Sequence, residues 1–143
     1  MKSLLVCIDP GNPDRTRSAV EQVTRLYRAA PVSVYLLLVK PQVSGHVAMY
    51  FDAGELQRLL TDWAREDLAP AQALLDFAGV PYTPIVRIGQ SARTITTVAR
   101  EYHCGRIVFG IDPPGLSERL LGSMAQQVRH LLQAQGDPEV IGS

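Results

Sequence analysis

The sequence predicts an α/β protein with an open, doubly wound, parallel sheet of five strands and helices on both faces. Short apolar runs alternate with longer stretches of helical periodicity along the whole chain, and this alternation is typical of parallel sheets with right-handed crossovers. Runs such as Leu36–Val39 are apolar at every position, as expected of strands covered by helices on both sides. The 143 residues contain no internal repeat or linker, so we predict a single domain spanning residues 1–143.

The first part of the chain predicts two strands joined by a helix. Leu4–Ile8 is an apolar strand pattern that ends at the turn-prone sequence Asp9–Gly11. Asn12 is expected to cap a helix that has Pro13 in its first turn, where the missing N–H costs nothing. A second strand is predicted at residues 32–39.

The connection that follows, residues 40–53, is long and contains bulky apolar side chains. These are Val43, Val47, Met49, Tyr50 and Phe51. Connections of this length are usually functional or mobile. Three interpretations stay open: the segment covers a ligand pocket, forms a partner surface, or packs as an ordinary loop.

The rest of the chain predicts three more helices and three more strands. A long helical pattern runs from Leu56 to Phe77, with a kink or break expected at Pro70 and an end at Gly79. The remaining elements are a strand at 82–88, a helix opened by Gly89 and a capping Ser91, a strand at 106–109 closing at Gly110, a helix around residues 120–132 and a short strand at 139–141. Periodicity alone would also allow one continuous helix from residue 117 to residue 133.

The charge balance and the short apolar runs exclude several classes of function. Fourteen Lys and Arg residues balance 14 Asp and Glu residues, so there is no basic surplus for a phosphate backbone and nucleic acid is not an expected partner. No apolar run approaches the roughly 20 residues that span a bilayer. The apolar N-terminal stretch is too short for a signal peptide. We therefore predict a cytoplasmic protein without membrane contact.

The cysteines and histidines show no metal-ligand spacing. Cys7 and Cys104 lie far apart, and the three histidines have no HxxxH or CxxC partner. Cys7 stands in an apolar run and is predicted to be a small buried side chain. No general base, nucleophile or metal cluster can be identified, so we expect neither a bound metal nor an enzymatic activity.

The carboxyl ends of the predicted strands form the candidate ligand site, because ligands of doubly wound sheets bind where the strand order reverses. This rule points to Asp9, to Val39 with the loop after it, and to Gly110 onward. No GxGxxG sequence follows the first strand, and the P-loop-like spacing that begins at Gly110 has Leu116 in place of the lysine.

A glycine-serine pair, Gly122-Ser123, precedes the last helical pattern. Such a pair can offer backbone N–H groups, a hydroxyl and the positive end of a helix dipole to an anion. The alternative is that the glycine only permits a turn and the serine only caps a helix.

Together these segments resemble the universal stress protein family. Leu5–Asp9 with Ser18-Ala19 is similar to the first strand and helix of that family, and Leu36–Val39 is similar to its second strand. Ile107–Gly110 is similar to the fourth strand, and Leu116–Ser123 resembles the signature segment. The match is distributed from about residue 4 to residue 132.

The resemblance implies an adenine-nucleotide alpha-hydrolase-like fold, a homodimer and a role in stress-response signalling. Some members bind ATP through the pattern G-x2-G-x9-G-[S/T]. By this resemblance Asp9 and Val39 face the adenosine end of an adenine nucleotide (ATP, ADP or AMP), while Gly110 and Gly122-Ser123 line its phosphates. The full set of nucleotide-binding residues implied in this way is Ile8, Asp9, Val39, Phe109, Gly110, Gly122, Ser123 and Met124.

The chain departs from the family pattern at the phosphate segment and at the C-terminus. The spacing Gly110–Gly122 is one residue short, and Pro113, which has no N–H, stands where the second glycine belongs. Asp112 adds a negative charge that repels a triphosphate, and no Lys or Arg precedes Arg119 in this segment. The last strand, residues 139–141, is short and carries a charge. We therefore predict a regulatory adenine-nucleotide site with weakened triphosphate binding. The alternative is a nucleotide-free, dimeric signalling module of the same fold.

Overall fold

The computed structural model describes residues 2–41, 49, 51–110, 124–132 and 137–141. Along these residues the elements are β1 (Ser3–Cys7), α1 (Pro13–Ala29), β2 (Ser33–Lys40), α3 (Ala53–Ala78), β3 (Thr83–Ile88), α4 (Ser91–Glu101), β4 (Arg106–Val108), α5 (Met124–Leu131) and β5 (Glu139–Ile141). The predicted alternation of strands and helices is confirmed, and every strand boundary lies within one residue of its predicted place. The alternative of one helix over residues 117–133 is not tested, because residues 117–123 and 133 lie outside the described residues.

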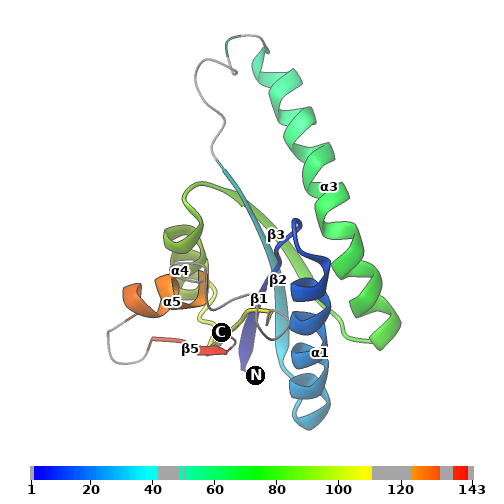
Figure 1. Cartoon of the computed structure of the whole chain (residues 1–143), viewed down its shortest axis with the longest axis vertical. Coiled ribbons are helices and arrows are strands. Elements are labelled where there is room, and N and C mark those ends of the chain that lie inside the picture. Colours follow the sequence, from blue (N-terminus) through cyan, green and yellow to red (C-terminus); the bar gives the residue numbers. More distant parts are fainter. Residues whose placement is uncertain (1, 42–48, 50, 111–123, 133–136, 142–143) are drawn as a thin grey trace.

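The five strands form one parallel sheet with the spatial order β3-β2-β1-β4-β5 (Figure 1). In the centre, Leu5 of β1 lies opposite Tyr35 of β2 on one side and Ile107 of β4 on the other. The chain moves outward from β1 to β3 and then returns to the far side of β1. The strand order therefore reverses between β1 and β4, which makes the sheet doubly wound as predicted.

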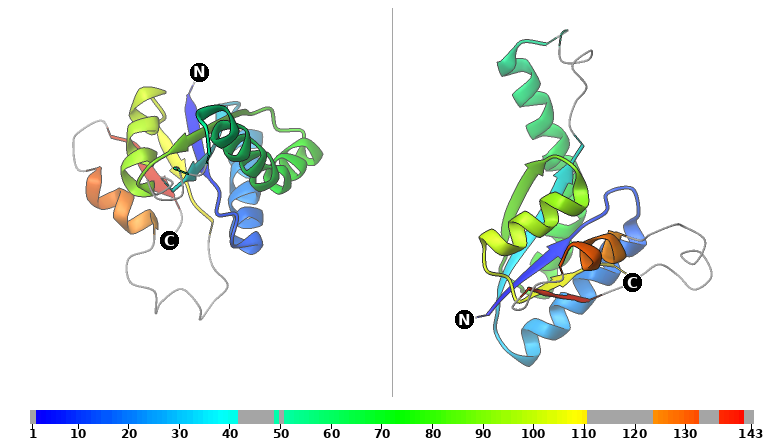
Figure 2. Two further views of the ribbon diagram at one scale, coloured as in Figure 1. Left: turned by 90° about the horizontal axis from the view of Figure 1, so that it is seen from above. Right: turned by 90° about the vertical axis from the view of Figure 1, so that its left-hand side faces the viewer.

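Helices cover both faces of the sheet, so the core is split into two layers (Figure 2). Helices α1 and α3 bury their apolar stripes against one face, and α4 and α5 bury theirs against the other. Successive residues of β1 point into different layers: Leu4 and Val6 belong to the first, Leu5 and Cys7 to the second. This division explains why β1 and β2 contain runs of successive apolar residues, Leu4–Cys7 and Leu36–Val39, instead of an apolar residue at every second position.

Helix α1 begins as the sequence predicts. The side chain of Asn12 accepts a hydrogen bond from the backbone N–H of Arg15 at 3.2 Å, and Pro13 occupies the first turn. Its buried face, Ala19, Val20 and Val23, packs into the first core layer. These contacts set the direction in which α1 leaves the end of β1.

Helix α3 continues through Pro70, so of the kink or break predicted there, the break does not occur. It continues from Ala53 to Ala78 and ends at Gly79, whose φ of 72° lies in the left-handed region that glycine enters without steric cost. Buried residues on both sides of the proline, Leu68 and Leu75 among them, pack against the sheet. We infer that this burial outweighs the cost of a proline inside a helix, which is about 3 kcal/mol for the lost backbone hydrogen bond and the clash of the ring together.

Helix α4 is capped by Gln90 and not by Ser91, which corrects the sequence-based interpretation. The Gln90 Oε1 atom accepts from the Arg93 N–H at 2.8 Å, whereas Ser91 is already the first helical residue. Glutamine is not among the residues preferred at the start of a helix, whereas serine is. A prediction based on these preferences therefore chose Ser91 over Gln90.

Of the long connection between β2 and α3, the structure describes the ends. Lys40 closes β2 and forms an ion pair with Asp67 of α3. Met49 and Phe51 are exposed, with Met49 at 82%, whereas Val43, Val47 and Tyr50 lie outside the described residues. Among the helices that are described, none is both long enough and apolar enough to cross a membrane.

The end of β4 packs tightly against the first turn of α1. Gly110 is buried, and a Cβ atom built on it would lie 1.9 Å from the Arg15 carbonyl oxygen. No flexible side chain is available to yield, because the nearest atoms all belong to the Arg15 backbone. A glycine is therefore required here for reasons of space.

The Gly110→Ala variant is expected to lose about 2–4 kcal/mol of unfolding free energy, because β4 or α1 must move to admit the methyl group. Urea denaturation measures the loss. Gly105→Ala is the matched control, since its Cβ would meet nothing closer than the Ser3 carbonyl oxygen at 4.0 Å. Equal midpoints for the two variants would contradict the close approach of Gly110 to α1.

Because the thiol of Cys104 is buried, the free energy of unfolding changes with pH in the alkaline range. Burial raises the pKa of this thiol from its ordinary value of 9.0 to about 11. Above pH 9 the unfolded chain releases a proton that the folded chain still holds, so the free energy of unfolding falls as the pH rises from 9 to 11. The contribution of one thiol is about 1 kcal/mol per pH unit.

We expect the wild-type protein to lose stability more steeply between pH 9 and pH 11 than the Cys104→Ala variant. Denaturant unfolding at a series of pH values measures both slopes, and the groups common to both proteins cancel in the difference. Identical slopes would show that the Cys104 thiol is not protected by burial.

Candidate functional site

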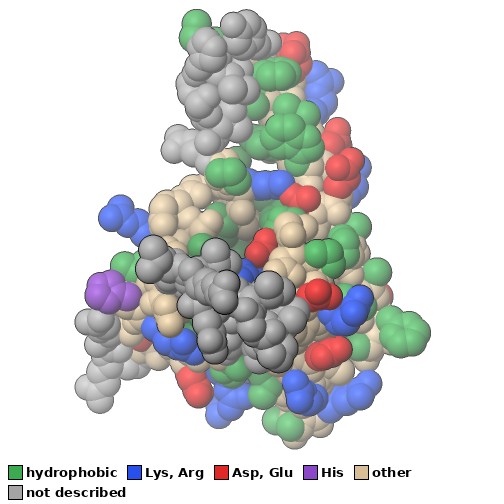
Figure 3. Space-filling model, viewed as in Figure 1, with side chains coloured by type: hydrophobic (Ala, Val, Ile, Leu, Met, Phe, Trp, Pro, Cys, Tyr) green, Lys and Arg blue, Asp and Glu red, His purple; other side chains and the backbone are tan. Residues whose placement is uncertain are grey.

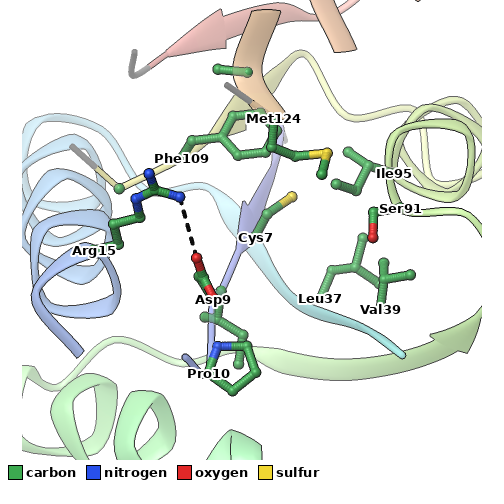
Figure 4. A pocket seen from close by; sticks show the side chains of 13 residues that line it. Cys7, Asp9, Pro10, Arg15, Leu37, Val39, Ser91, Ile95, Phe109 and Met124 are labelled. Atoms are coloured by element: carbon green, nitrogen blue, oxygen red, sulfur yellow. Dashed lines mark hydrogen bonds and ion pairs between the residues drawn. The ribbon is translucent and has the colours of Figure 1, made fainter. Parts of the chain in front are cut away.

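A pocket of about 210 Å³ lies at the carboxyl ends of β1, β2 and β4, where the strand order reverses (Figure 4). Residues of α4 (Ser91 and Ile95) and of α5 (Met124 and Ala125) complete its walls. The described residues that line it are Cys7, Ile8, Asp9, Pro10, Arg15, Leu37, Val39, Ser91, Ile95, Phe109, Gly110, Met124 and Ala125.

Six of the eight residues implicated from the sequence line this one pocket. They are Ile8, Asp9, Val39, Phe109, Gly110 and Met124, and they come from four separate parts of the chain. The remaining two, Gly122 and Ser123, lie outside the described residues.

The inner wall of the pocket is apolar. Leu37 and Val39 of β2 face Ile95 of α4, and Phe109 and Met124 close the opposite side (Figure 4). The sulfur atoms of Cys7 and Met124 both point into the space between these walls. Such a wall suits the flat, weakly polar face of an aromatic heterocycle better than it suits an ion.

Asp9 supplies the acidic group of the pocket and is held by the turn after β1. Its Oδ1 accepts from the Gly11 N–H at 3.1 Å. Its backbone carbonyl accepts from the Asn12 N–H at 3.0 Å and from the Thr16 hydroxyl at 3.3 Å. The carboxylate therefore has a defined orientation before any ligand arrives, although its side chain is still 46% exposed.

Arg15 is the residue at this site that sequence reasoning missed. It reaches from the first turn of α1, and its Nη1 donates to Asp9 Oδ2 at 3.2 Å. The six-residue separation follows no helical or strand period, because a turn lies between the two residues. The predicted turn at Asp9–Gly11 and the cap at Asn12 were the signal that could have placed Arg15 near Asp9.

The backbone of Phe109 is held by hydrogen bonds to two other elements, α1 and β5. Its carbonyl accepts from Gln22 Nε2 of α1 at 3.1 Å, and its N–H donates to the Ile141 carbonyl of β5 at 2.8 Å. The short C-terminal strand thus helps to position a residue of the pocket. No pattern in the sequence indicates the contact of Gln22 with Phe109 across 87 residues.

The pocket thiol is not poised for nucleophilic chemistry. Cys7 is buried, as predicted, and burial raises the pKa of its thiol far above the ordinary value, with the nearby Cys104 adding to the effect. The reactive form of cysteine is the thiolate, so Cys7 is an inert side chain at neutral pH. Within the described residues, no three His, Cys, Asp or Glu side chains gather closely enough to hold a metal ion.

The charges on the described surface are mixed. On the face seen in Figure 3, Lys and Arg side chains alternate with Asp and Glu side chains and form no broad patch of one sign. This distribution matches the formal net charge of zero and offers no extended track for a nucleic-acid backbone on that face.

Solved structures with the same architecture cover nearly the whole chain. The hypothetical protein MJ0577 aligns with a TM-score of 0.72 at 21% identity, over 99% of this chain and 96% of its own. A universal stress protein from Archaeoglobus fulgidus in complex with dAMP aligns at 0.67 with 19% identity, over 99% and 97%. A universal stress protein in complex with cAMP aligns at 0.71 with 15% identity, over 99% and 96%. At these identities the likeness establishes the fold.

No curated protein matches the sequence significantly. The family profile, in contrast, is matched by residues 1–133, which include every strand of the sheet except β5 and every described helix. The resemblance noted in the sequence is confirmed: this chain belongs to the universal stress protein family.

Proposed function

We propose that this protein is a stress-response protein that binds an adenine nucleotide as a regulatory ligand in the pocket between β1 and β4. The observation that carries the proposal is the convergence of Asp9, Val39, Phe109 and Met124 on one cavity. These residues are separated by as many as 115 positions (124 − 9) in the sequence. In doubly wound sheets this position is the usual place for a ligand.

The shape and chemistry of the pocket support a nucleoside at its inner end. Apolar walls formed by Leu37, Val39 and Ile95 can stack against an adenine ring, while Asp9 at the mouth can accept hydrogen bonds from hydroxyl or amino groups. The two similar structures in complex with dAMP and cAMP are members of the same family. They support an adenine nucleotide as the class of ligand to test first.

The triphosphate is the part of ATP that this chain is least suited to hold. The segment that the resemblance assigns to the phosphates contains Pro113 in place of a glycine and Asp112 beside it. We therefore propose that AMP or ADP binds at least as well as ATP, with Gly110, Gly122 and Ser123 nearest the phosphates.

A regulatory role, and not catalysis, is the activity that we propose for the bound nucleotide. The buried Cys7 thiol is held in its protonated form, and Asp9 is engaged by Arg15 and by the turn after β1. Among the described residues, neither group has the neighbouring base that activates a nucleophile. We further propose that the protein acts as a homodimer, as the family resemblance implies. Its length and its short apolar runs predict a single domain that acts in the cytoplasm.

Titration calorimetry with adenosine, AMP and ATP tests the proposal. We expect heat with AMP, and a dissociation constant for ATP that is no smaller than that for AMP. A Ser91→Phe substitution is expected to weaken AMP binding at least tenfold, because Ser91 lines the pocket from the first turn of α4 and the ring would occupy its space.

The matched control is Thr97→Phe, which adds the same ring to the exposed side of α4. The control is expected to bind AMP like the wild-type protein. Absence of heat with all three compounds would reject the nucleotide and favour the nucleotide-free, dimeric signalling module. Equal weakening by both substitutions would show that the pocket is not the binding site.

A further inference from the structure

A second cavity, of about 560 Å³, lies between α3 and β3, the strand at one edge of the sheet. Residues of three elements line it, among them Lys40 of β2, Leu60 and Leu68 of α3, and Val86 and Ile88 of β3. None of its described lining residues belongs to the proposed nucleotide pocket. This α3–β3 groove is therefore a separate place where a ligand can bind.

The groove exists because α3 leaves the face of β3 partly uncovered. Side chains alternate along a strand, and Ile85 is buried with residues of α4 in the second core layer. Its neighbours Val86 and Ile88 therefore point to the other face, on which α3 lies. There they remain 39% and 48% exposed, while the first part of α3 extends beyond the end of β2 (Figure 1). The sheet thus ends in an apolar strip that no described helix covers completely.

The apolar part of the lining is aliphatic. It consists of Leu60, Ala64, Leu68, Pro84, Val86 and Ile88, and the described lining includes no aromatic side chain. An alkyl chain fits such a wall, because each methylene group that leaves water adds to the free energy of binding. A flat ring would find no aromatic partner to stack on here.

The charged part of the lining has one sign. The described lining residues include Lys40, Arg65 and Arg87 but no Asp or Glu. Glu66, which follows Arg65 on α3, lines a different cavity beside α1. The described charges of the groove are thus cationic, and an anion is their complement.

The three cations differ in their partners. Lys40 forms an ion pair with Asp67, and Arg87 forms one with Glu101 at 3.5 Å. Arg65, in contrast, forms no ion pair within the described part of the chain. A guanidinium can bind a carboxylate through two parallel N–H donors. Arg65 is therefore the cation best placed to receive one.

We propose that the α3–β3 groove binds an amphiphilic carboxylate with a single aliphatic chain. The chain lies against Leu68, Val86 and Ile88, and the carboxylate pairs with Arg65. This inference goes beyond the proposed function, since both the ligand and the site differ from those of the nucleotide. Charge complementarity favours this occupant over a second copy of the chain, because a two-fold contact would bring two cationic grooves together.

Titration calorimetry of the full chain with three soluble probes tests the proposal. Decanoate carries the chain and the carboxylate, decyltrimethylammonium carries the same chain and the opposite charge, and acetate carries the carboxylate alone. The two amphiphiles are used below the concentrations at which they form micelles. We expect decanoate to bind about tenfold more tightly than decyltrimethylammonium, because the groove repels a cation. Acetate is expected to give no measurable heat.

Arg65→Glu is expected to weaken decanoate binding about tenfold, because it reverses the charge beside the carboxylate. Its matched control is Arg58→Glu, which makes the same change at an exposed position of α3 outside the groove. Val86→Asp places a negative charge on the apolar wall and is expected to abolish decanoate binding. Thr83→Asp, on the same strand and outside the groove, is expected to leave it unchanged. Thermal unfolding shows whether each variant is folded, and Arg65→Glu decides the question if Val86→Asp does not fold.

Ser91→Phe, which fills part of the nucleotide pocket, separates the two sites and is expected to bind decanoate like the wild-type protein. The proposal is overturned if the wild-type protein gives no heat with decanoate, if the two charged amphiphiles bind equally, or if Arg65→Glu binds decanoate as Arg58→Glu does. Weaker decanoate binding by Ser91→Phe would place the carboxylate in the nucleotide pocket and overturn it as well. None of these outcomes depends on whether AMP binds.

Discussion

The site depends on the parallel pairing of β1 with β2 on one side and with β4 on the other. Because all three strands run in the same direction, their carboxyl ends meet at one edge of the sheet. The helices that follow β1 and β4 in the sequence, α1 and α5, pack against opposite faces of the sheet. A crevice between them is the geometric result, and it brings Asp9 and Phe109 together across 100 positions (109 − 9) of sequence.

Two kinds of contact keep this crevice in shape. Close packing acts at Gly110, where the absence of a side chain lets the end of β4 touch the first turn of α1. Hydrogen bonding acts at Phe109, which is tied to α1 through Gln22 and to β5 through Ile141. The pocket therefore has an apolar interior of constrained geometry and an ion pair, Asp9 with Arg15, at its mouth.

Most of the fold and part of the site could be predicted from the residues alone. Apolar runs such as Leu36–Val39 located the strands, because their burial on both faces leaves a local pattern. A distant contact decided the path of α3, whereas a local contact decided the cap of α4. Helix α3 passes through Pro70 because Leu68 and Leu75 are buried against the sheet. A rule based on neighbouring residues does not include the free energy of that burial. The cap at Gln90 was missed because glutamine rarely takes this role.

The α/β class, the order of the elements and the strand ends at which a ligand site should lie could all be predicted from the residues. They could be predicted because strand burial, helix caps and turn residues leave local patterns in the chain. The folded structure was needed to show which strand ends are neighbours, that Arg15 lies beside Asp9 and that Gly110 touches α1. These facts depend on the lateral order of the strands and on side-chain packing across the crevice. No period along the sequence encodes a distance between residues held on different elements.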